Sequence, residues 1–405
     1  MNRTFLAASL SGALLLAALS GSPQLWAVEN SAAPANSQAT AGDSELAYRA
    51  AIAKIESSQG AYAAGLSEQL LSLGLSMQSQ GRHTEAIDLF KRGVHLARIN
   101  NGLHSVEQIP LLQGQITSQV ALGNYAAADE RQNYMYRVQI RGIESGESRT
   151  TALMQQATWQ HNAFRLDIGN QGFNRLMNMW DLYRLALNDI IAREGETSPE
   201  LLPPLHGMLQ AQYLISSYRP ENNSSASADD MGSRQQLNRF YAYRSQSYEK
   251  GRSVILAIYG IEKQQGDQGV AAARARVMLG DWELWHDNRD RAQQAYQAAL
   301  AELAGRDDAQ VQAEQLLGKP VALPDIDGIR PLPPAVGAEQ GNILLEFGVS
   351  DRGRVINLER LDESEGSDAA ANRLMRKLRK TTFRPRFDAG EPIETEKLVW
   401  TYDIN

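Results

Sequence analysis

Apolar residues recur three and four positions apart from Glu45 to about Leu317, which is the spacing of amphipathic helices. Alanine, glutamine, leucine and arginine are abundant in this stretch, and runs of β-branched residues are nearly absent. A helical stretch of about 270 residues is too long for one simple bundle, so internal repeats are the first possibility to test. The pattern therefore predicts an all-α domain over residues 45–317.

The pattern changes after Lys319. Prolines are frequent between residues 320 and 334, and they predict a stiff, extended linker over residues 318–335 because proline cannot continue a helix. Apolar residues then alternate over 343–349, the turn Ser350-Asp351-Arg352-Gly353 follows, and a second strand is expected over 355–361. A helix to about Lys380 and a last strand ending near Ile404 complete a small α+β domain, residues 336–405.

One motif appears twice in the helical region. Its first copy has leucines and a glycine in one helix, a glycine turn, and alanine and phenylalanine in the next: Leu70, Leu73, Gly74, Met77, Gly81, Ala86, Phe90 and Gly93. Its second copy is Leu279, Gly280, Ala292, Tyr296 and Ala299, with Asp287-Asn288 at the turn. Gly74 and Ala86 are small where two helices would cross, and Phe90 is expected to fill the groove between hairpins. This motif closely resembles the tetratricopeptide repeat (TPR), whose unit is a helix hairpin.

The repeat signal is weaker between the two copies. Gly123 and Tyr125 restart the pattern 42 residues after Gly81, so longer helices than usual are expected there. Residues 154–192 and 201–218 are predicted to be helical, and a polar stretch from Pro220 to Gln236 is predicted to be a loop. The aromatic core candidates in these helices are Trp159, Phe164, Trp180 and Tyr183.

The order of elements after residue 336 resembles the C-terminal domain of the TonB family. The matching motifs are Asp351 with Gly353, Thr382-Phe383-Arg384-Pro385, and Gly390-Glu391-Pro392. The TonB family uses this domain to engage an extended peptide of outer-membrane transporters, so the resemblance implies protein or peptide binding. An open sheet edge can accept such a segment by strand addition. The candidate binding residues of the last strand are Leu398, Trp400 and Tyr402; alternatively, the charges of Glu394, Glu396 and Lys397 keep this edge idle.

A cluster of positive charge lies next to this strand. Its members are Arg373, Arg376, Lys377, Arg379, Lys380, Arg384 and Arg386. As a binding site, Arg376, Arg379, Arg384 and Arg386 would contact an acidic protein or anionic lipid heads. As a structural feature, the cluster is the exposed side of an amphipathic helix, balanced by nearby acidic residues, and this second interpretation is favoured.

The first residues are typical of an export signal. Arg3 precedes an apolar run over residues 5–19, and cleavage is expected after Ala27 or, as the less favoured alternative, at Ser20. The sequence thus predicts a signal peptide over residues 1–27, a disordered lead-in over 28–44, and a periplasmic location. The alternative is an uncleaved inner-membrane anchor facing the periplasm, in a TonB-like energy transducer that acts on outer-membrane transport. Against that alternative, the run lacks histidine, and Leu332-Pro333-Pro334 replaces the family's tyrosine-proline.

The composition narrows the possible chemistry. The net charge of −7 argues against nucleic-acid binding, since such proteins need excess lysine and arginine. The chain has no cysteine, which excludes disulfides and thiolate metal sites, and its six histidines show no metal-ligand spacing. No nucleophile or phosphate-loop motif appears. The sequence therefore predicts a periplasmic adaptor, not an enzyme, that binds proteins without cofactor or metal; an uncharacterised envelope enzyme is the less favoured alternative.

Overall fold

The computed structural model describes residues 35–220, 231–265, 269–337, 340–362 and 367–404. The predicted signal peptide, residues 1–27, and the start of the lead-in lie outside these ranges. Among the described residues, no helix is sufficiently long and apolar to cross a membrane. All of them belong to one unit, Ala32–Asn405.

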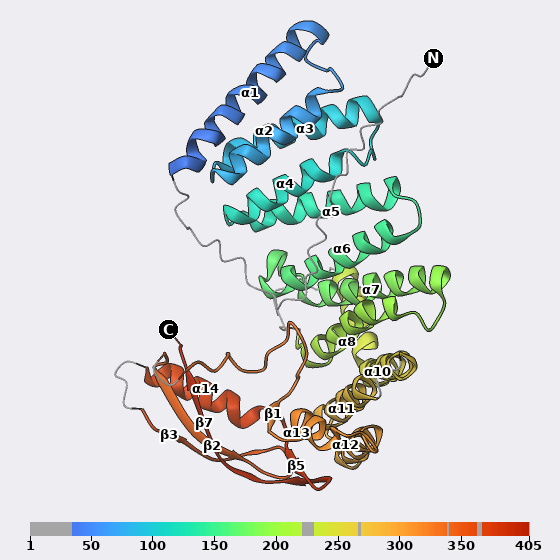
Figure 1. Cartoon of the computed structure of the whole chain (residues 1–405), viewed down its shortest axis with the longest axis vertical. Coiled ribbons are helices and arrows are strands. Elements are labelled where there is room, and N and C mark those ends of the chain that lie inside the picture. Colours follow the sequence, from blue (N-terminus) through green and yellow to red (C-terminus); the bar gives the residue numbers. More distant parts are fainter. Residues whose placement is uncertain (1–34, 221–230, 266–268, 338–339, 363–366, 405) are drawn as a thin grey trace, which may run out of the picture. The chain divides into compact units, whose positions relative to one another are not determined.

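Antiparallel helix hairpins make up most of the described chain. The hairpins pair α2 (Leu66–Ser79) with α3 (His83–Asn101), α4 (Gln108–Ala121) with α5 (Tyr125–Gly142), α6 (Glu147–Arg165) with α7 (Gly172–Glu194), α8 (Leu202–Ser217) with α10 (Ser247–Gln264), and α11 (Val270–Trp285) with α12 (Arg289–Glu302). Helix α1 (Ala35–Gln59) packs on α2, α9 (Met231–Ser245) stands between α8 and α10, and α13 (Ala309–Leu317) follows α12. Successive hairpins lie side by side in chain order (Figure 1), so the predicted helical region is confirmed.

The first motif packs as its spacing predicts. A Cβ atom on Gly74 of α2 would lie 2.4 Å from Phe90 Cε1, and one on Gly114 of α4 would lie 2.6 Å from Phe90 Cζ. Both distances are far below the roughly 3.5 Å of a carbon–carbon contact. The Phe90 ring of α3 therefore fills a slot between two neighbouring hairpins, and the slot requires glycine on both sides. Gly81 makes the turn between α2 and α3 with φ +75°.

The second motif repeats this packing in the last hairpin. A Cβ atom on Gly280 of α11 would lie 2.3 Å from Tyr296 Cε1 on α12. Asp287 takes the left-handed turn conformation, φ +62°, that Gly81 has in the first hairpin. These two hairpins therefore share one packing scheme and are TPR-like.

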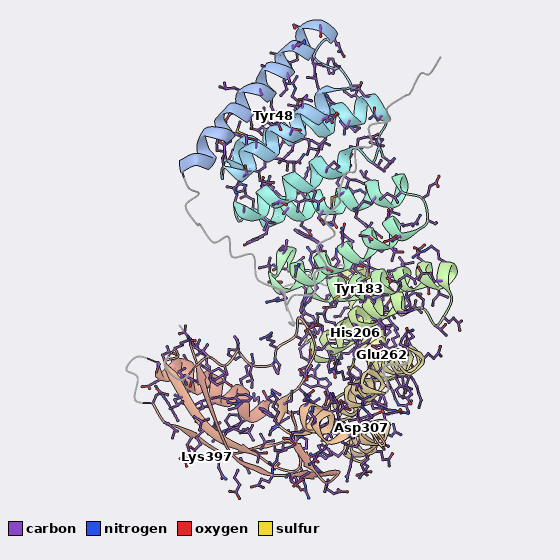
Figure 2. All side chains as sticks on the ribbon, viewed as in Figure 1. Tyr48, Tyr183, His206, Glu262, Asp307 and Lys397 are labelled. Carbon is purple, nitrogen blue, oxygen red and sulfur yellow. The ribbon has the colours of Figure 1, made fainter. Side chains whose placement is uncertain are left out.

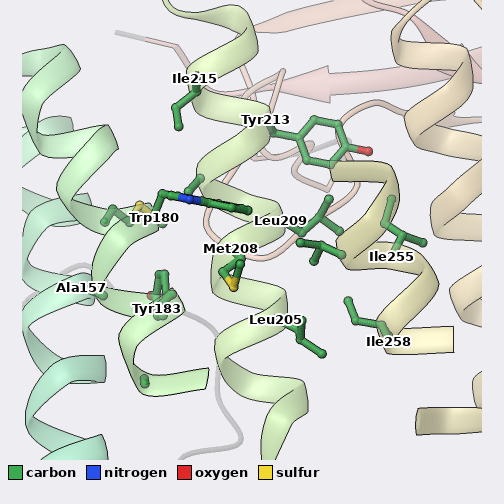
Figure 3. Packing of buried hydrophobic residues seen from close by; sticks show 14 of the residues in the cluster. Ala157, Trp180, Tyr183, Leu205, Met208, Leu209, Tyr213, Ile215, Ile255 and Ile258 are labelled. Carbon is green, nitrogen blue, oxygen red and sulfur yellow. The ribbon is translucent and has the colours of Figure 1, made fainter. Parts of the chain in front are cut away.

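The middle hairpins are joined by large apolar side chains. Trp180 of α7, Met208 of α8 and Ile255 of α10 are buried in one cluster (Figure 3). A second apolar cluster covers α1 to α5. Between the two clusters, α5 and α6 also meet through polar groups, because Gln132 donates to Gln156 at 3.0 Å. The apolar core is thus divided at the α5–α6 junction.

Two predicted boundaries are wrong. The lead-in was expected to run to residue 44, but α1 begins at Ala35, because its small and polar residues continue the helix whose Ile52 and Ile55 pack into the core. The loop was expected to reach Gln236, but α9 begins at Met231. Phe240, buried among Phe173 and Tyr218, anchors this otherwise polar helix.

The end of the chain forms a sheet covered by one helix. Strands β2 (Ile343–Val349), β3 (Val355–Arg360) and β7 (Thr395–Tyr402) pair antiparallel in the order β3-β2-β7. Helix α14 (Asp368–Lys380) buries Ala371, Leu374 and Leu378 against this sheet. Two short pairs complete the module: β1 (Val321–Ala322) with β4 (Phe383–Arg384), and β5 (Arg386–Asp388) with β6 (Glu391–Ile393). We call residues 336–404 with these strands the C-terminal module.

The segment predicted as a linker, residues 318–335, is instead packed against the folded protein at several points. Val321 and Ala322 pair with Arg384 and Phe383, and Leu323 has no exposed surface. Leu332 is buried in the core of the C-terminal module. The prediction was wrong because proline is compatible with extended backbone beside a strand, and the aliphatic residues between the prolines are buried or half-buried.

Candidate protein-binding surfaces

A buried ion pair joins the C-terminal module to the last hairpin. The Arg384 guanidinium donates to Asp281 Oδ2 at 2.7 Å, and both side chains are almost fully buried. The Tyr296 hydroxyl donates to the other carboxylate oxygen, Oδ1, at 2.8 Å. Burial raises the pKa of the Asp281 carboxyl, and Arg384 offsets part of that rise. Removing either partner would leave an uncompensated charge inside the protein.

An aromatic contact reinforces this junction. Phe387 of β5 meets Tyr296 of α12 edge to face, with ring centroids 5.0 Å apart. Gln293 of α12 also donates to the Glu391 carboxylate of β6 at 2.9 Å. Gly114 of α4 contacts the Phe90 ring in the first hairpin, whereas the ring of Phe387 contacts Tyr296 in the last one. The C-terminal module therefore packs on the aromatic residue of the last hairpin that corresponds to Phe90 in the first.

Arg384 was predicted to contact a partner, and that prediction is wrong. Its side chain is 5% exposed and bound to Asp281 within the molecule. Arg384 lies with Phe383 on the buried strand β4, whereas the basic residues from Arg373 to Lys380 lie on helix α14. Arg386, also a candidate, is half-buried on β5.

Helix α14 presents the rest of the basic cluster outward. Arg373, Arg376, Lys377, Arg379 and Lys380 are all exposed, on the side opposite the buried Leu374 and Leu378. None of the five forms an ion pair with an acidic side chain of the described ranges, which omit Glu363 and Glu365. We call these five residues the α14 basic face.

Three of the acidic residues that were expected to balance this cluster bind other side chains. Arg360 of β3 binds Asp362 at 2.7 Å and Asp368 at 2.6 Å. Glu391 accepts hydrogen bonds from Gln293 and Gln297 of α12. The favoured interpretation, a locally balanced helix surface, therefore receives no support from Asp362, Asp368 or Glu391. Among the described residues, no acidic side chain is paired with the α14 basic face.

The candidate residues of the last strand lie mainly on the core side. Tyr402 has no exposed surface, and Trp400 packs edge to face on Phe347 with centroids 5.1 Å apart. Leu398 is half-buried against the same core. Their side chains support the module, so a partner would meet the backbone edge of β7 and the opposite face, where Val399 is 47% exposed and Lys397 lies (Figure 2).

The edge of β7 is covered at one point. The Val336 amide donates to the Thr401 carbonyl at 2.8 Å, on the side of β7 away from β2. Among the described residues no other strand pairs with this edge. Lys397 binds Glu346 of the neighbouring strand at 2.8 Å, so this charge is used within the sheet.

Comparisons with known proteins give distant structural matches. No family model matches the chain, and no curated protein matches it. BtubC from P. vanneervenii is 13% identical, covering 76% of this chain and 98% of that one, with a TM-score of 0.36. A kinesin light chain with TPR-like repeats from Podosopora anserina is also 13% identical, covering 61% and 98%, with a TM-score of 0.37. The glycine–aromatic packing of the first and last matched hairpins is the observation that makes this chain TPR-like.

The likeness of the C-terminal module to the TonB family stays a prediction. The hairpin, the helix and the last strand stand in the predicted order, and Gly353 takes the positive φ of +70° expected at the turn. A Cβ atom on Gly353 would lie 1.9 Å from the Phe383 carbonyl oxygen, so the turn packs directly against β4. This close approach gives the Asp351–Gly353 and Phe383–Pro385 motifs one structural reason to occur together.

A further surface was not predicted from the sequence. Residues 323–332, which we call the strap, lie against α6 and α8. The Gln210 amide of α8 donates to the Asp327 carbonyl of the strap at 2.6 Å. A Cβ atom on Gly328 would lie 2.2 Å from Gln210 Nε2 and 3.1 Å from His161 Cε1 on α6. Ile326 and Ile329 pack on the core of the middle hairpins.

Two histidines lie near the strap. Burial, with a smaller contribution from Arg165, lowers the pKa of His161 to about 4. Burial also lowers the pKa of His206 on α8, opposed by the nearby Asp327 (Figure 2). No sequence pattern connected these residues, which lie more than a hundred positions from the strap. In the described ranges, no group of three histidine, cysteine or acidic side chains could hold a metal ion.

Proposed function

We propose that this protein is an adaptor of the bacterial cell envelope that binds an acidic protein partner through the α14 basic face. The observation that carries the proposal is the set of five exposed cations on one helix without acidic partners among the described residues. Protein surfaces usually intersperse both signs of charge, so an uncompensated group favours a ligand of the opposite charge. A TPR-like fold supports the same class of function, because stacked hairpins offer extended surfaces to other proteins.

The repeat body and the C-terminal module act together in this proposal. The Arg384–Asp281 pair and the Phe387–Tyr296 contact hold α14 on a module that shares its packing with α12. A partner bound to α14 is therefore held firmly to the repeat body and not by a loose tether. For the same reason, deleting residues 336–405 is a poor test, since it would also leave Asp281 buried and unpaired.

Charge reversal in the full chain is the direct test. The variant carries Arg376→Glu, Lys377→Glu and Lys380→Glu, and a photoreactive residue at Arg373 reports on partner contact in envelope preparations. The matched control carries Lys54→Glu, Arg234→Glu and Arg274→Glu, three exposed cations on other helices with the same change in net charge. We expect the crosslink to a protein to disappear in the first variant and persist in the control.

Two outcomes would count against the proposal. Equal crosslinking in both variants would show that the α14 charges do not select the partner. Loss of binding to anionic vesicles, with no protein crosslink in any variant, would assign the α14 basic face to a membrane surface instead. Circular dichroism of each variant checks that the fold is unchanged.

The envelope location is also part of the proposal and rests on the N-terminal export pattern. N-terminal sequencing of the protein from fractionated cells tests it directly. A mature protein that begins near Val28 in the soluble periplasmic fraction is expected. An intact N-terminus retained in the inner membrane would support the anchored alternative.

A further inference from the structure

We propose that the surface of α6 and α8 beneath the strap is a binding site for an extended segment of a partner protein, which displaces the strap. We expect the segment to carry one aliphatic residue on each side of an Asp-Gly turn, as in Ile326-Asp327-Gly328-Ile329. This strap site is separate from the α14 basic face and goes beyond the function proposed above.

The strap shows which features the site recognises. Ile326 and Ile329 flank the two-residue turn Asp327-Gly328. Both isoleucines pack, half-buried, on the apolar core of the middle hairpins. Gln210 donates to the carbonyl between them at 2.6 Å. Gly328 has φ +78°, and Gln210 leaves no room for a Cβ atom there, so glycine is required at this position. The strap site therefore selects two aliphatic side chains, one backbone carbonyl and a glycine.

The middle of the strap is held less firmly than its ends. Leu323 is fully buried in the cluster of the last hairpin, and Leu332 is buried in the core of the C-terminal module. Between them, Asp325, Asp327 and Arg330 are exposed, and Asp325 accepts a long hydrogen bond, 3.4 Å, from Arg384 of the C-terminal module. Among the described residues, the hydrogen bond from Gln210 is the one that α6 and α8 give to this middle part. The middle can therefore lift from α8 while both ends stay in place.

The strap also leaves one polar group of the site unsatisfied. His161 is 6% exposed, and its Nε2 atom has no hydrogen-bond partner among the described residues. Its ring lies beside Gly328, which has no side chain to offer it. A buried polar atom without a partner costs free energy. A partner segment that supplies a hydrogen bond to His161 therefore has an advantage over the strap.

The chain's own sequence provides the probe. A fluorescent nine-residue peptide, residues 323–331, is titrated into the full-length protein and into a variant with Ile326→Asp and Ile329→Asp. The strap competes at a high effective concentration in the wild type, so the variant should bind the peptide at least about tenfold more tightly. The matched control is Val311→Asp with Val399→Asp, which alters two exposed aliphatic residues elsewhere and should bind like the wild type.

Two further measurements make the result specific. A peptide with serine at both isoleucine positions should not bind the released variant, and adding Gln210→Ala to that variant should weaken binding of the original peptide. Equal binding of the peptide to wild type and released variant, no binding to either, or binding of the serine peptide would overturn the proposal. Charge reversal on α14 should leave peptide binding unchanged, which separates this result from the adaptor proposal.

A second variant covers the possibility that the released chain fails to fold. Gly328→Ala places a methyl group against Gln210 and strains a positive φ, so it displaces the strap with a smaller change. Gly123→Ala is its control, because Gly123 has φ +72° and no neighbour within 4 Å. The peptide should bind Gly328→Ala more tightly than Gly123→Ala, and equal affinities would overturn the proposal.

Discussion

The first and last matched hairpins share one packing scheme and differ in what lies next to it. Phe90 lies between glycines of two hairpins, whereas Tyr296 lies between Gly280 and Phe387 of the C-terminal module. The residue after the helix glycine differs accordingly. Leu75 is 47% exposed, but Asp281 is buried and bound to Arg384 and Tyr296. The same local motif thus leaves a free surface in one place and holds a second structural unit in another.

The largest expected effect breaks the last hairpin's attachment. Arg384→Ala leaves Asp281 buried without its partner, and should lower the free energy of unfolding by about 3–5 kcal/mol. Leu75→Ala, the corresponding change in the first hairpin, should cost about 0.5 kcal/mol or less because the side chain is half exposed. Urea unfolding of both variants measures the difference. Arg384→Met with Asp281→Leu should recover most of the loss, and equal costs for the two single variants would contradict the comparison.

Lowering the pH should reduce the free energy of unfolding through His161, which lies under the strap. The pKa of His161 is about 4 in the folded chain and near 6.5 unfolded, so the unfolded state binds more protons between these values. Stability should therefore fall as the pH drops from 6.5 to 4, by about 3 kcal/mol from this residue. The check is the unfolding free energy against pH for wild type and His161→Gln. Parallel profiles would show that His161 does not contribute.

The glycine–aromatic packing shared by the two hairpins can be tested by adding one methyl group to the helix glycine of each. Gly74→Ala and Gly280→Ala each place a Cβ atom within 2.4 Å of an aromatic ring. Overpacking of this kind should cost about 2 kcal/mol at each position. Thermal unfolding measures both. A loss at Gly74 but not at Gly280 would mean that the last hairpin does not share the scheme.

The smallest expected effect isolates one hydroxyl group. Tyr296→Phe converts the last hairpin's ring to that of the first and removes the hydrogen bond to Asp281. Because the acceptor is charged, the loss should be about 1.5 kcal/mol. Equilibrium unfolding decides, with Tyr125→Phe, at an exposed tyrosine, as the control. A neutral Tyr296→Phe would mean that Arg384 alone satisfies Asp281.

Local patterns predicted the parts of the fold that depend on local spacing. Gly74, Phe90, Gly280 and Tyr296 could be placed because the helix period puts them at a crossing. The junction could not be predicted, since Asp281 and Arg384 lie 103 residues apart and no periodicity relates them. The basic cluster looked uniform in sequence, yet its helical members are exposed and Arg384 is buried. The two environments differ because α14 ends at Lys380, and Arg384 lies beyond that end.

The place of Phe387 against Tyr296 limits how such a chain can lengthen. A repeat protein grows when a hairpin is duplicated and the copy packs on its neighbour. A copy inserted after α12 would separate Tyr296 from Phe387 and Asp281 from Arg384. A copy inserted before α6 would keep both contacts and also those of the strap with α6 and α8. New hairpins can therefore be added on the N-terminal side of α6, while α6 to α12 stay with the end of the chain.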